Sequence, residues 1–386
     1  MKNRALVNTI STRLAEKQPF IQVIVGPRQV GKTTALKASI GRHAIYESAD
    51  YPTPTSANLI IEWWNTTLKS ESKILAIDEI QKISGWTEIL KKLWDENPKT
   101  LKVVVTGSSA LLLEKGLKES LAGRFELIRA EHWNYQEVKK IFGLTLAEFI
   151  EFGCYPGSIP LLKDNLNRWG RYVRDSIVEP AIGRDLLQLY TIDQPALLRQ
   201  IFGAAVSLPA QIVSLQKMQG QLQGKGTLPT IQNYLKLLSE AFLVSGVEKY
   251  SASLIRSKKS SPKLIVHDNG LIRVFERPIG EKISSEKMGR YFENCIGARF
   301  IEAGWNTYYW KDRDLEVDFV VIGPNNEKWA IEVKTTKTSR QGLKGLFKFC
   351  GLYKDFEPVL ISMVGQKIDE VKNISAEEVL SFSRKY

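Results

Sequence analysis

Short apolar runs alternate with segments of helical spacing through the first 140 residues. The run from Phe20 to Val25 has one polar position, which is the pattern of a strand buried on both faces. Residues 74–77 and 101–105 are also mainly apolar. The segment from Gly31 to Gly41 follows the first run and has the spacing of a helix. Strands that alternate with helices in this way predict an α/β fold with a parallel sheet.

The pattern becomes mainly helical after residue 140. Helical spacing continues from Leu144 to Gln200, with a turn at residues 153–160, where two glycines and two prolines occur. Three helices are then predicted at 201–207, 210–223 and 227–247, followed by β-prone segments at 247–251 and 262–268. The last part predicts a helix at 289–304, strands within 307–323 and at 329–336, and one more strand and helix.

A glycine-rich segment joins the first predicted strand to the first predicted helix. Its pattern, Gly26-x-x-x-x-Gly31-Lys32-Thr33, is that of a Walker A phosphate-binding loop. Backbone N–H groups would surround the phosphates, Lys32 would neutralise the β and γ oxygens, and the Thr33 hydroxyl would hold Mg²⁺. The residues predicted to contact nucleotide are Gly26, Pro27, Arg28, Gln29, Val30, Gly31, Lys32, Thr33, Thr34 and Ser108. ATP and Mg²⁺ are therefore the predicted cofactors.

Polar side chains end the second and third apolar runs. Asp78 and Glu79 follow the second run, and two carboxylates at the end of a buried strand are costly unless they are used. We predict that Asp78 holds the Mg²⁺ shell and that Glu79 polarises the attacking water as general base. The third run ends in Thr106 to Ser109, which would lie beside the γ-phosphate in a parallel sheet. A structural turn accounts for these hydroxyls equally well.

Arg124 is a candidate catalytic residue for a neighbouring subunit. It follows the third run, at a position where a cation usually points away from its own nucleotide. It would then act as an arginine finger in the site of a second copy, which predicts a homo-oligomer. The alternative is a surface arginine that caps the end of a helix.

Four motifs make the N-terminal part similar to a known family. They are "GPRQVGKTT", "DEIQ", "TGSSA" and "LAGR", in this order. Residues 20–130 resemble the AAA-type ATPase module of a prokaryotic family in which this module is joined to a DUF4143 C-terminal region. Members often continue with a "PLSF-E" segment, whereas this chain has Glu131-His-Trp-Asn-Tyr-Gln-Glu137. The resemblance implies a P-loop ATPase.

Positive charge is concentrated in the middle of the chain. The net charge is +12, and residues 201–264 hold eight Lys and Arg against two Asp and Glu. Residues 265–386, by contrast, hold nineteen against eighteen. Such a segment favours a polyanionic partner, here DNA, although a solvated surface is an alternative.

The same segment predicts a winged helix. Three helices and a basic hairpin form this motif, in which the third helix enters the major groove and the wing contacts phosphates. The resemblance agrees, since members of the family carry a helix-turn-helix-like segment here. The predicted DNA contacts are Gln232, Asn233 and Lys236 in the groove, and Arg256, Lys258 and Lys259 on the backbone. Winged helices also serve as lids or protein-interaction modules.

Acidic residues recur in the C-terminal third. Glu293 lies on a predicted helix, Asp318 lies in a predicted strand, and Glu332 precedes Lys334 by two residues, on the same side of the next strand. Carboxylates at these three positions could hold Mg²⁺ for DNA cleavage, with Lys334 positioning water or offsetting phosphate charge. We therefore predict Asp318, Glu332 and Lys334 as catalytic. The set resembles the PD-(D/E)xK nuclease-like fold. Inactive modules of this fold also occur, and the alternative here is a buried salt-bridge cluster around Lys334.

The sequence predicts a cytoplasmic protein of several domains. No run approaches the roughly 18 apolar residues of a membrane span, and the first twenty residues have the pattern of an amphipathic helix rather than a secretory signal. Three widely separated cysteines suggest neither disulfides nor zinc. The predicted domains are an ATPase (1–140), a helical lid or connector (141–200), a winged-helix-like domain (201–268) and a nuclease-like domain (269–386).

Two functions remain open from the sequence. The first is an ATPase that binds DNA and couples its nucleotide state to the nuclease-like domain. The second is a nucleotide-dependent switch or scaffold that binds a protein partner and has an inert nuclease-like domain. They differ in whether DNA stimulates ATP hydrolysis. A transporter has no support in the sequence, because no membrane span or long apolar surface segment is visible.

Overall fold

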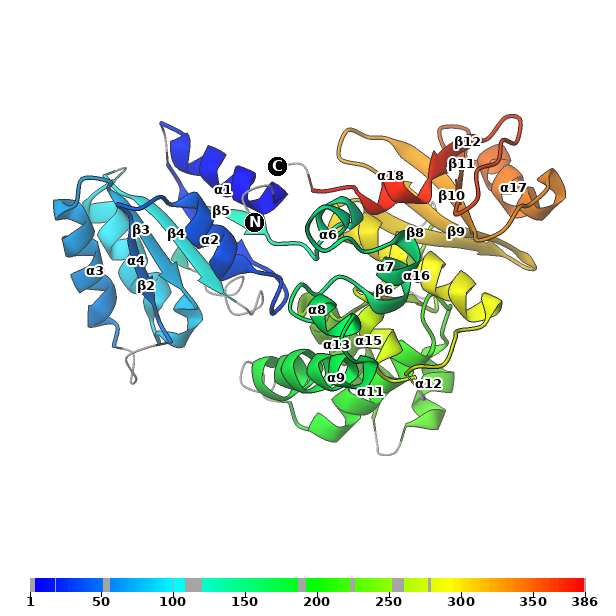
Figure 1. Ribbon diagram of the computed structural model, residues 1–386, viewed down its shortest axis with the longest axis horizontal. Helices are drawn as coiled ribbons and strands as arrows, with labels where there is room; N and C mark the ends of the chain where they lie inside the picture. The colour runs from blue at the N-terminus through cyan, green and yellow to red at the C-terminus, as the bar shows by residue number, and fades with distance from the viewer. Residues whose placement is uncertain are drawn as a thin grey trace. The chain divides into compact units, whose positions relative to one another are not determined.

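The computed structural model describes residues 4–17, 19–50, 56–98, 100–107, 120–186, 192–222, 226–251, 260–276 and 279–384, apart from the side chains of residues 184 and 185 (Figure 1). The described chain divides after Glu131 into two compact units. Among these residues, no helix has the length and apolar character needed to cross a membrane. The finer domain boundaries, at residues 140, 200 and 268, stay a prediction.

The first unit is an α/β layer structure. Its helices are α1 (Ala5–Ala15), α2 (Lys32–Ser39), α3 (Asn58–Lys69), the short 3₁₀-helix η1 (Ile80–Lys82) and α4 (Trp86–Glu96). Its strands are β1 (Ile21–Val25), β2 (Ile45–Ser48), β3 (Ile74–Asp78), β4 (Lys102–Gly107) and β5 (Phe125–Arg129). Helix α1 packs against α2, and α3 packs against α4. Figure 1 shows α3 on one side of the sheet and α1 with α2 on the other.

All strand pairs of the first sheet are parallel, in the order β2-β3-β4-β1-β5. Every residue of β1 is buried, as its apolar run predicted. The predicted parallel α/β sheet is therefore confirmed. Because the strands are parallel, the segments that follow β1, β3 and β4 meet at one edge of the sheet.

The second unit contains a larger, mixed sheet. Its helices are α6 (Tyr135–Phe142), α7 (Leu146–Phe152), α8 (Ile159–Leu162), α9 (Leu166–Tyr172), the π-helical turns η2 (Val173–Val178) and η3 (Ala181–Leu186), α11 (Pro195–Ser207), α12 (Leu215–Gln221), α13 (Leu228–Glu240), α15 (Asn269–Arg273), α16 (Ser285–Glu302), the 3₁₀-helix η4 (Arg340–Leu343), α17 (Lys344–Leu352) and α18 (Ala376–Leu380). Its strands are β6 (Val244–Lys249), β7 (Lys263–Val266), β8 (Asn306–Asp312), β9 (Leu315–Ile322), β10 (Lys328–Lys334), β11 (Glu357–Ser362) and β12 (Lys372–Ser375).

The seven strands form one sheet, in the order β12-β11-β10-β9-β8-β6-β7. Strands β6 and β7 are antiparallel, and β6 also pairs in parallel with β8. The hairpin of the predicted winged helix therefore extends the same sheet as the predicted nuclease-like strands. Helix α16 contacts β7, β8, β9 and β10. This arrangement brings Lys263 of β7 into contact with Glu316 and Asp318 of β9, which follow it by more than fifty residues.

Three predictions of secondary structure in this unit were wrong. The helix predicted at 210–223 begins only at Leu215. The third helix ends at Glu240 rather than at 247, because Phe242 has a φ of 59° and the chain turns there into β6. Left-handed backbone cannot continue a right-handed helix. The C-terminal tail also contains two strands, β11 and β12, where one was predicted. Strand β12 has four residues with one buried side chain, so it lacks an apolar run that would reveal it.

Candidate functional site

The phosphate-binding loop connects the end of β1 to the start of α2. A Cβ atom on Gly26 would lie 2.2 Å from the carbonyl oxygen of Ala130, so glycine is required there. Gly31 has a φ of 87°, which glycine adopts without strain. Lys32 is buried, and its Nζ donates to the carbonyl oxygens of Gly26 at 3.0 Å and Pro27 at 2.7 Å. The ammonium thus lies against the first two residues of the loop.

The other predicted nucleotide contacts follow the same loop. Pro27 and Val30 are buried, Arg28 and Thr33 are half-buried, and Gln29 and Thr34 are exposed. No local pattern in the sequence indicated Arg4, which is buried and donates to the carbonyl oxygens of Val30 and Glu131. Its guanidinium ties the start of α1 to the loop. Ser108 lies outside the described residues.

Asp78 is held by hydroxyl groups from the strands on either side of β3. Its Oδ1 accepts a hydrogen bond from the Thr106 hydroxyl, and its Oδ2 accepts one from the Tyr46 hydroxyl at 2.9 Å. Burial, followed by the charge of Asp78, raises the pKa of Tyr46, which keeps this hydroxyl a donor at neutral pH. The sequence did not predict Tyr46, because strand β2 is four residues long and only half-buried. Two donors therefore orient the carboxylate.

Glu79 lies beside Asp78 in an unusual backbone conformation. Its φ is 55°, in the left-handed region that is rare outside glycine and often marks functional sites. Its Oε2 accepts a hydrogen bond from Gln81 Nε2 at 2.6 Å, and its backbone N–H donates to the Thr106 hydroxyl at 3.4 Å. Thr106 thus connects both acids. Oxygen donors are the ligands that Mg²⁺ prefers, so Asp78 and the Thr33 hydroxyl fit the ion predicted here.

Arg124 lies at the opposite end of the strands of the same sheet, where their amino termini lie. It directly precedes β5, and its carbonyl oxygen accepts from the N–H of Ile21 at the start of β1. The phosphate-binding loop, by contrast, follows the end of β1. Arg124 therefore does not reach the phosphate-binding loop of its own chain. Its guanidinium forms an ion pair with Asp95.

The predicted DNA contacts that the structure describes lie on α13. Gln232, Asn233 and Lys236 are all exposed there. Gln232 and Lys236 line a groove of about 510 Å³ that Gly246 and Glu248 of β6 border on the other side. Three helices, α11 to α13, precede the β6–β7 hairpin, as predicted. Arg256, Lys258 and Lys259 lie outside the described residues.

The predicted nuclease-like residues lie near one another in the second unit, where their charges affect each other's pKa values. Asp318 Oδ2, on β9, accepts from the N–H of Val333 at 2.8 Å. Lys334 Nζ contacts Glu332 Oε1 at 2.6 Å, so these two side chains lie on the same side of β10, as predicted. Burial, and then the charge of Asp318, raises the pKa of Glu332 to about 8, against the opposing effect of Lys334.

Lys263 is a member of this cluster that sequence reasoning missed. It is one of the eight basic residues of the segment 201–264, but its side chain is only 1% exposed. Its Nζ lies 2.5 Å from Glu293 Oε1 and 3.3 Å from Glu316 Oε1. Burial, and then the charge of Asp318, raises the pKa of Glu293 to about 7, and Lys263 opposes this shift. All four residues of β7 are buried, so the strand has no alternation of polar and apolar residues that would indicate which way Lys263 points.

The carboxylates of this cluster do not converge on one point. In the described parts of the chain, one group of three His, Cys, Asp or Glu side chains has ligand atoms that all lie within 4.8 Å of one another, and it is His132, His267 and Glu302. Glu293, Asp318 and Glu332 do not form such a group. Together with the ammonium of Lys263 among them, this geometry does not fit a divalent ion held by these three residues.

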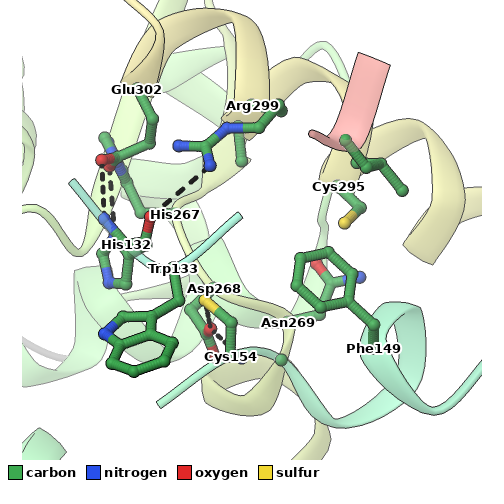
Figure 2. Close-up of a pocket in the computed structure, with 13 residues that line it drawn as sticks. His132, Trp133, Phe149, Cys154, His267, Asp268, Asn269, Cys295, Arg299 and Glu302 are labelled. Carbon is green, nitrogen blue, oxygen red and sulfur yellow. Dashed lines mark hydrogen bonds and ion pairs between the residues drawn. The ribbon is translucent and has the colours of Figure 1, made fainter. Parts of the chain in front are cut away.

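His132, His267 and Glu302 form a buried hydrogen-bond network within the second unit. Figure 2 shows Glu302 facing both histidines. Glu302 Oε1 lies 3.2 Å from His132 Nδ1 and 2.5 Å from His267 Nδ1, and Oε2 accepts from the N–H of His132 at 3.1 Å. The two Nε2 atoms contact the hydroxyls of Tyr155 and Ser245, at 3.2 and 2.7 Å. Each ring nitrogen thus has a hydrogen-bond partner.

The charge of Glu302 is strongly favoured in this network. Burial alone would raise its pKa, but His132 and His267 outweigh burial and hold the pKa well below its usual range. An adjacent cavity of about 30 Å³ is lined by these residues together with Cys154 and Asp268 (Figure 2). Cys154 donates to Asp268 Oδ2 from both its backbone N–H and its thiol. The network lies far from the phosphate-binding loop in sequence, and no local pattern predicts it.

Comparison with known families assigns the two ends of the chain. Residues 18–139 match the AAA domain, residues 143–278 match a domain of unknown function (DUF8612), and residues 288–382 match another, DUF4143. The chain joins an AAA domain to a DUF4143 region. This combination is the one that the motifs of the sequence predicted. The phosphate-binding loop, Asp78 and Glu79 lie within the AAA domain, and the carboxylate cluster draws Glu293, Asp318 and Glu332 from DUF4143.

The chain is also similar to proteins from distant organisms. An uncharacterised protein of Methanocaldococcus jannaschii is 25% identical over 353 residues, covering 83% of this chain and 76% of that protein. One of Mycobacterium tuberculosis is 26% identical over 334 residues, covering 84% and 72%. One of Haemophilus influenzae is 25% identical over 331 residues, covering 78% and 79%.

Two solved structures are loosely similar. AMPPCP-bound DnaA from Aquifex aeolicus has 20% identity and a TM-score of 0.33, covering 62% of this chain and 88% of that chain. RuvB from Thermotoga maritima, a Holliday junction branch migration motor, has 16% identity and a TM-score of 0.35, covering 63% and 88%. The fold assignment comes from the strand order of the first unit, since these scores are low.

Proposed function

We propose that this chain binds and hydrolyses ATP in its first unit and that the nucleotide state controls the binding of DNA by its second unit. The observation that carries the proposal is the meeting of three strand ends: the loop after β1, the acids after β3 and the hydroxyl of Thr106 at the end of β4. Ligands of open parallel sheets bind at such an edge.

Each residue of this edge has a role in the proposed reaction. The N–H groups of the loop and the ammonium of Lys32 would bind the phosphates, with Lys32 exchanging its two carbonyl partners for phosphate oxygens. Thr33 and Asp78 would hold Mg²⁺, which neutralises charge on the phosphates. Glu79 would accept a proton from the attacking water, and its hydrogen bond from Gln81 would orient the carboxylate.

Binding of DNA is supported by the second unit's exposed surface on α13. Gln232, Asn233 and Lys236 present amide and ammonium groups on one exposed helix next to the groove. Amide side chains can read base edges, and lysine binds phosphate. The basic segment contributes less surface charge than its composition suggests, because Lys263 is buried.

The rate of ATP hydrolysis with and without DNA tests the proposal. We expect duplex, single-stranded or branched DNA to raise the rate of the full chain. Lys32→Ala should lose hydrolysis in every condition, and Glu79→Gln should lose hydrolysis while it keeps ATP binding. A rate that no nucleic acid changes would contradict control of DNA binding by nucleotide. If Lys32→Ala and Glu79→Gln both keep full ATPase activity, the assignment of the site is contradicted.

A second candidate is a nucleotide-dependent switch that binds a protein partner and has an inert nuclease-like region. The observation that favours it is Lys263, which occupies the carboxylate cluster. The cluster would then have no part in cleavage, because its residues do not fit a divalent ion. The direct test is incubation of the chain with plasmid and linear DNA plus Mg²⁺ or Mn²⁺, beside Asp318→Ala. Cleavage that is lost in Asp318→Ala would contradict an inert nuclease-like region and would support nuclease activity of the chain.

A further inference from the structure

The cation of the carboxylate cluster is supplied by the chain itself. Lys263 lies at the start of β7 and is fully buried. Besides Glu293 and Glu316, its Nζ approaches Asp318, at 3.9 Å from Oδ1, and it donates to the carbonyl oxygen of Asp318 at 3.1 Å. The ammonium also lies 5.0 Å from the centre of the Phe319 ring. Acids from a helix and a strand thus surround one ammonium group.

The oxygens that a metal would need are directed to donors of the protein. Glu293 contacts Lys263, Asp318 accepts from the N–H of Val333, and Glu332 contacts Lys334. Each of the three carboxylates thus has a different donor of the protein, and their oxygens do not meet at one point. A divalent ion would need these oxygens to turn toward one point, and it would meet the positive charge of Lys263 there.

The Lys263 ammonium is held among the carboxylates by its ion pairs and by the sheet. A buried charge is stable only when it is paired, and the acids of α16 and β9 are its partners. Its main chain is held in the sheet, because Lys263 pairs with Val247 of β6. The ammonium is therefore present at every protein concentration, whereas a metal ion must compete from solution.

We propose that the ammonium of Lys263 is the resident cation of this cluster and that the cluster binds no divalent metal while Lys263 is in place. The DUF4143 region would then keep a nuclease-like arrangement of strands as a binding or assembly module. This inference concerns the second unit alone and does not depend on ATP hydrolysis.

Binding of Mn²⁺ to the nucleotide-free full chain, followed by the electron paramagnetic resonance signal of free Mn²⁺, tests the inference. All variants carry Asp78→Asn, which removes the metal ligand of the first unit. We expect this parent protein to lack an Mn²⁺ site that depends on Asp318. Adding Asp318→Asn should therefore leave its Mn²⁺ binding unchanged. Lys263→Met, which has similar length and no charge, should gain about one Mn²⁺ per chain, and adding Asp318→Asn should remove the gain. Lys263→Arg, which keeps the charge, should gain none.

Two results would overturn the inference. The first is Mn²⁺ binding by the parent protein, with Lys263 in place, that is lost when Asp318→Asn is added. The second is a Lys263→Met protein with the circular dichroism spectrum and melting temperature of the parent but without the added Mn²⁺ site. Neither result depends on whether ATP is hydrolysed or DNA is bound.

Discussion

Arg124 donates to both carboxylate oxygens of Asp95, through Nε at 2.6 Å and Nη2 at 2.9 Å. This two-pronged ion pair holds the guanidinium at the edge of the first sheet opposite to the phosphate-binding loop. Asp95 is the main cause of the raised pKa of Arg124, and Arg124 in turn lowers the pKa of Asp95. An arginine that is oriented and fully charged in this way could serve the site of a second copy.

If Arg124 acts in a neighbouring subunit, Arg124→Ala should lower kcat for ATP by a factor of about 10³ to 10⁵. A mixture of Arg124→Ala, which keeps the phosphate loop, with Lys32→Ala, which keeps the arginine, should regain activity. The rate per chain should also rise with protein concentration. Asp95→Asn is the control, because it removes the ion pair and keeps the arginine. Equal loss in Asp95→Asn and Arg124→Ala, without recovery in the mixture, would assign the pair a structural role.

The position of Glu79, directly after Asp78 at the end of β3, predicts a specific effect of removing its charge. Glu79→Gln should lower kcat by a factor of about 10² to 10⁴, because the water loses its general base, while the affinity for ATP stays within about twofold. Tyr46→Phe removes one of the two donors to Asp78 and should lower kcat less than Glu79→Gln. Steady-state kinetics and binding of a fluorescent ATP analogue measure both. A Glu79→Gln variant with unchanged kcat would assign the base to another residue.

Gly26 has no room for a side chain. Gly26→Ala should cost about 1 to 3 kcal/mol of stability and abolish ATP binding, because its Cβ would overlap the carbonyl oxygen of Ala130. Gly203→Ala is the control, since a Cβ built there meets no atom within 4 Å apart from neighbouring residues and backbone of its own helix. It should leave ATP binding unchanged and raise stability by up to about 1 kcal/mol. Thermal unfolding and ATP binding compare the two, and an unaffected Gly26→Ala would refute the close contact.

The low pKa of Glu302 predicts an acid-sensitive second unit. An unfolded glutamate titrates at about pH 4.3, and in the folded state the pKa lies well below this value. The stabilisation from Glu302 is therefore fully present above about pH 4.3 and is lost as the pH falls toward the folded pKa. Glu302→Gln should cost about 3 kcal/mol at pH 7 and make the remaining stability less dependent on acid.

Hydrogen exchange in α16 after equilibration in urea, at pH 7 and at about pH 3, which is below the unfolded pKa, measures this effect. Glu370→Gln is the control, because it removes an exposed ion pair with Arg340 and should cost less than about 1 kcal/mol. Glu302→Gln and Glu370→Gln proteins of equal stability at pH 7 would show that the network contributes nothing.

Lys236 tests the predicted DNA surface. Lys236→Ala should weaken binding to all sequences alike and reduce the dependence of log affinity on log salt by about one unit, since one phosphate contact is lost. Gln232→Ala should instead change the preference among sequences. Lys344→Ala, at an exposed position on α17, is the control for loss of charge. If Lys344→Ala weakens binding as much as Lys236→Ala, the groove beside α13 is not the DNA site.

Local features of the first unit were predictable because they depend on neighbouring residues. The strand, loop and helix around Lys32 are contiguous, so the spacing of two glycines and a lysine sets the backbone that surrounds a phosphate. Asp78 and Glu79 were predictable for the same reason, as acids at the end of an apolar run. The partners of Asp78 were not, because Tyr46 and Thr106 come from strands whose order in the sheet the sequence does not state.

The sequence by itself determined the phosphate loop, the acids that follow β3, and the strand positions of Asp318, Glu332 and Lys334. Tertiary structure alone decided that Lys263 lies among the carboxylates and that Glu302 lies between two histidines. The physical reason is range: a helix or loop is encoded by hydrogen bonds between near neighbours, whereas a buried charge is paired by whichever strands and helices meet. Lys263 is distinguished from the other lysines of its basic segment only by the sheet that buries it.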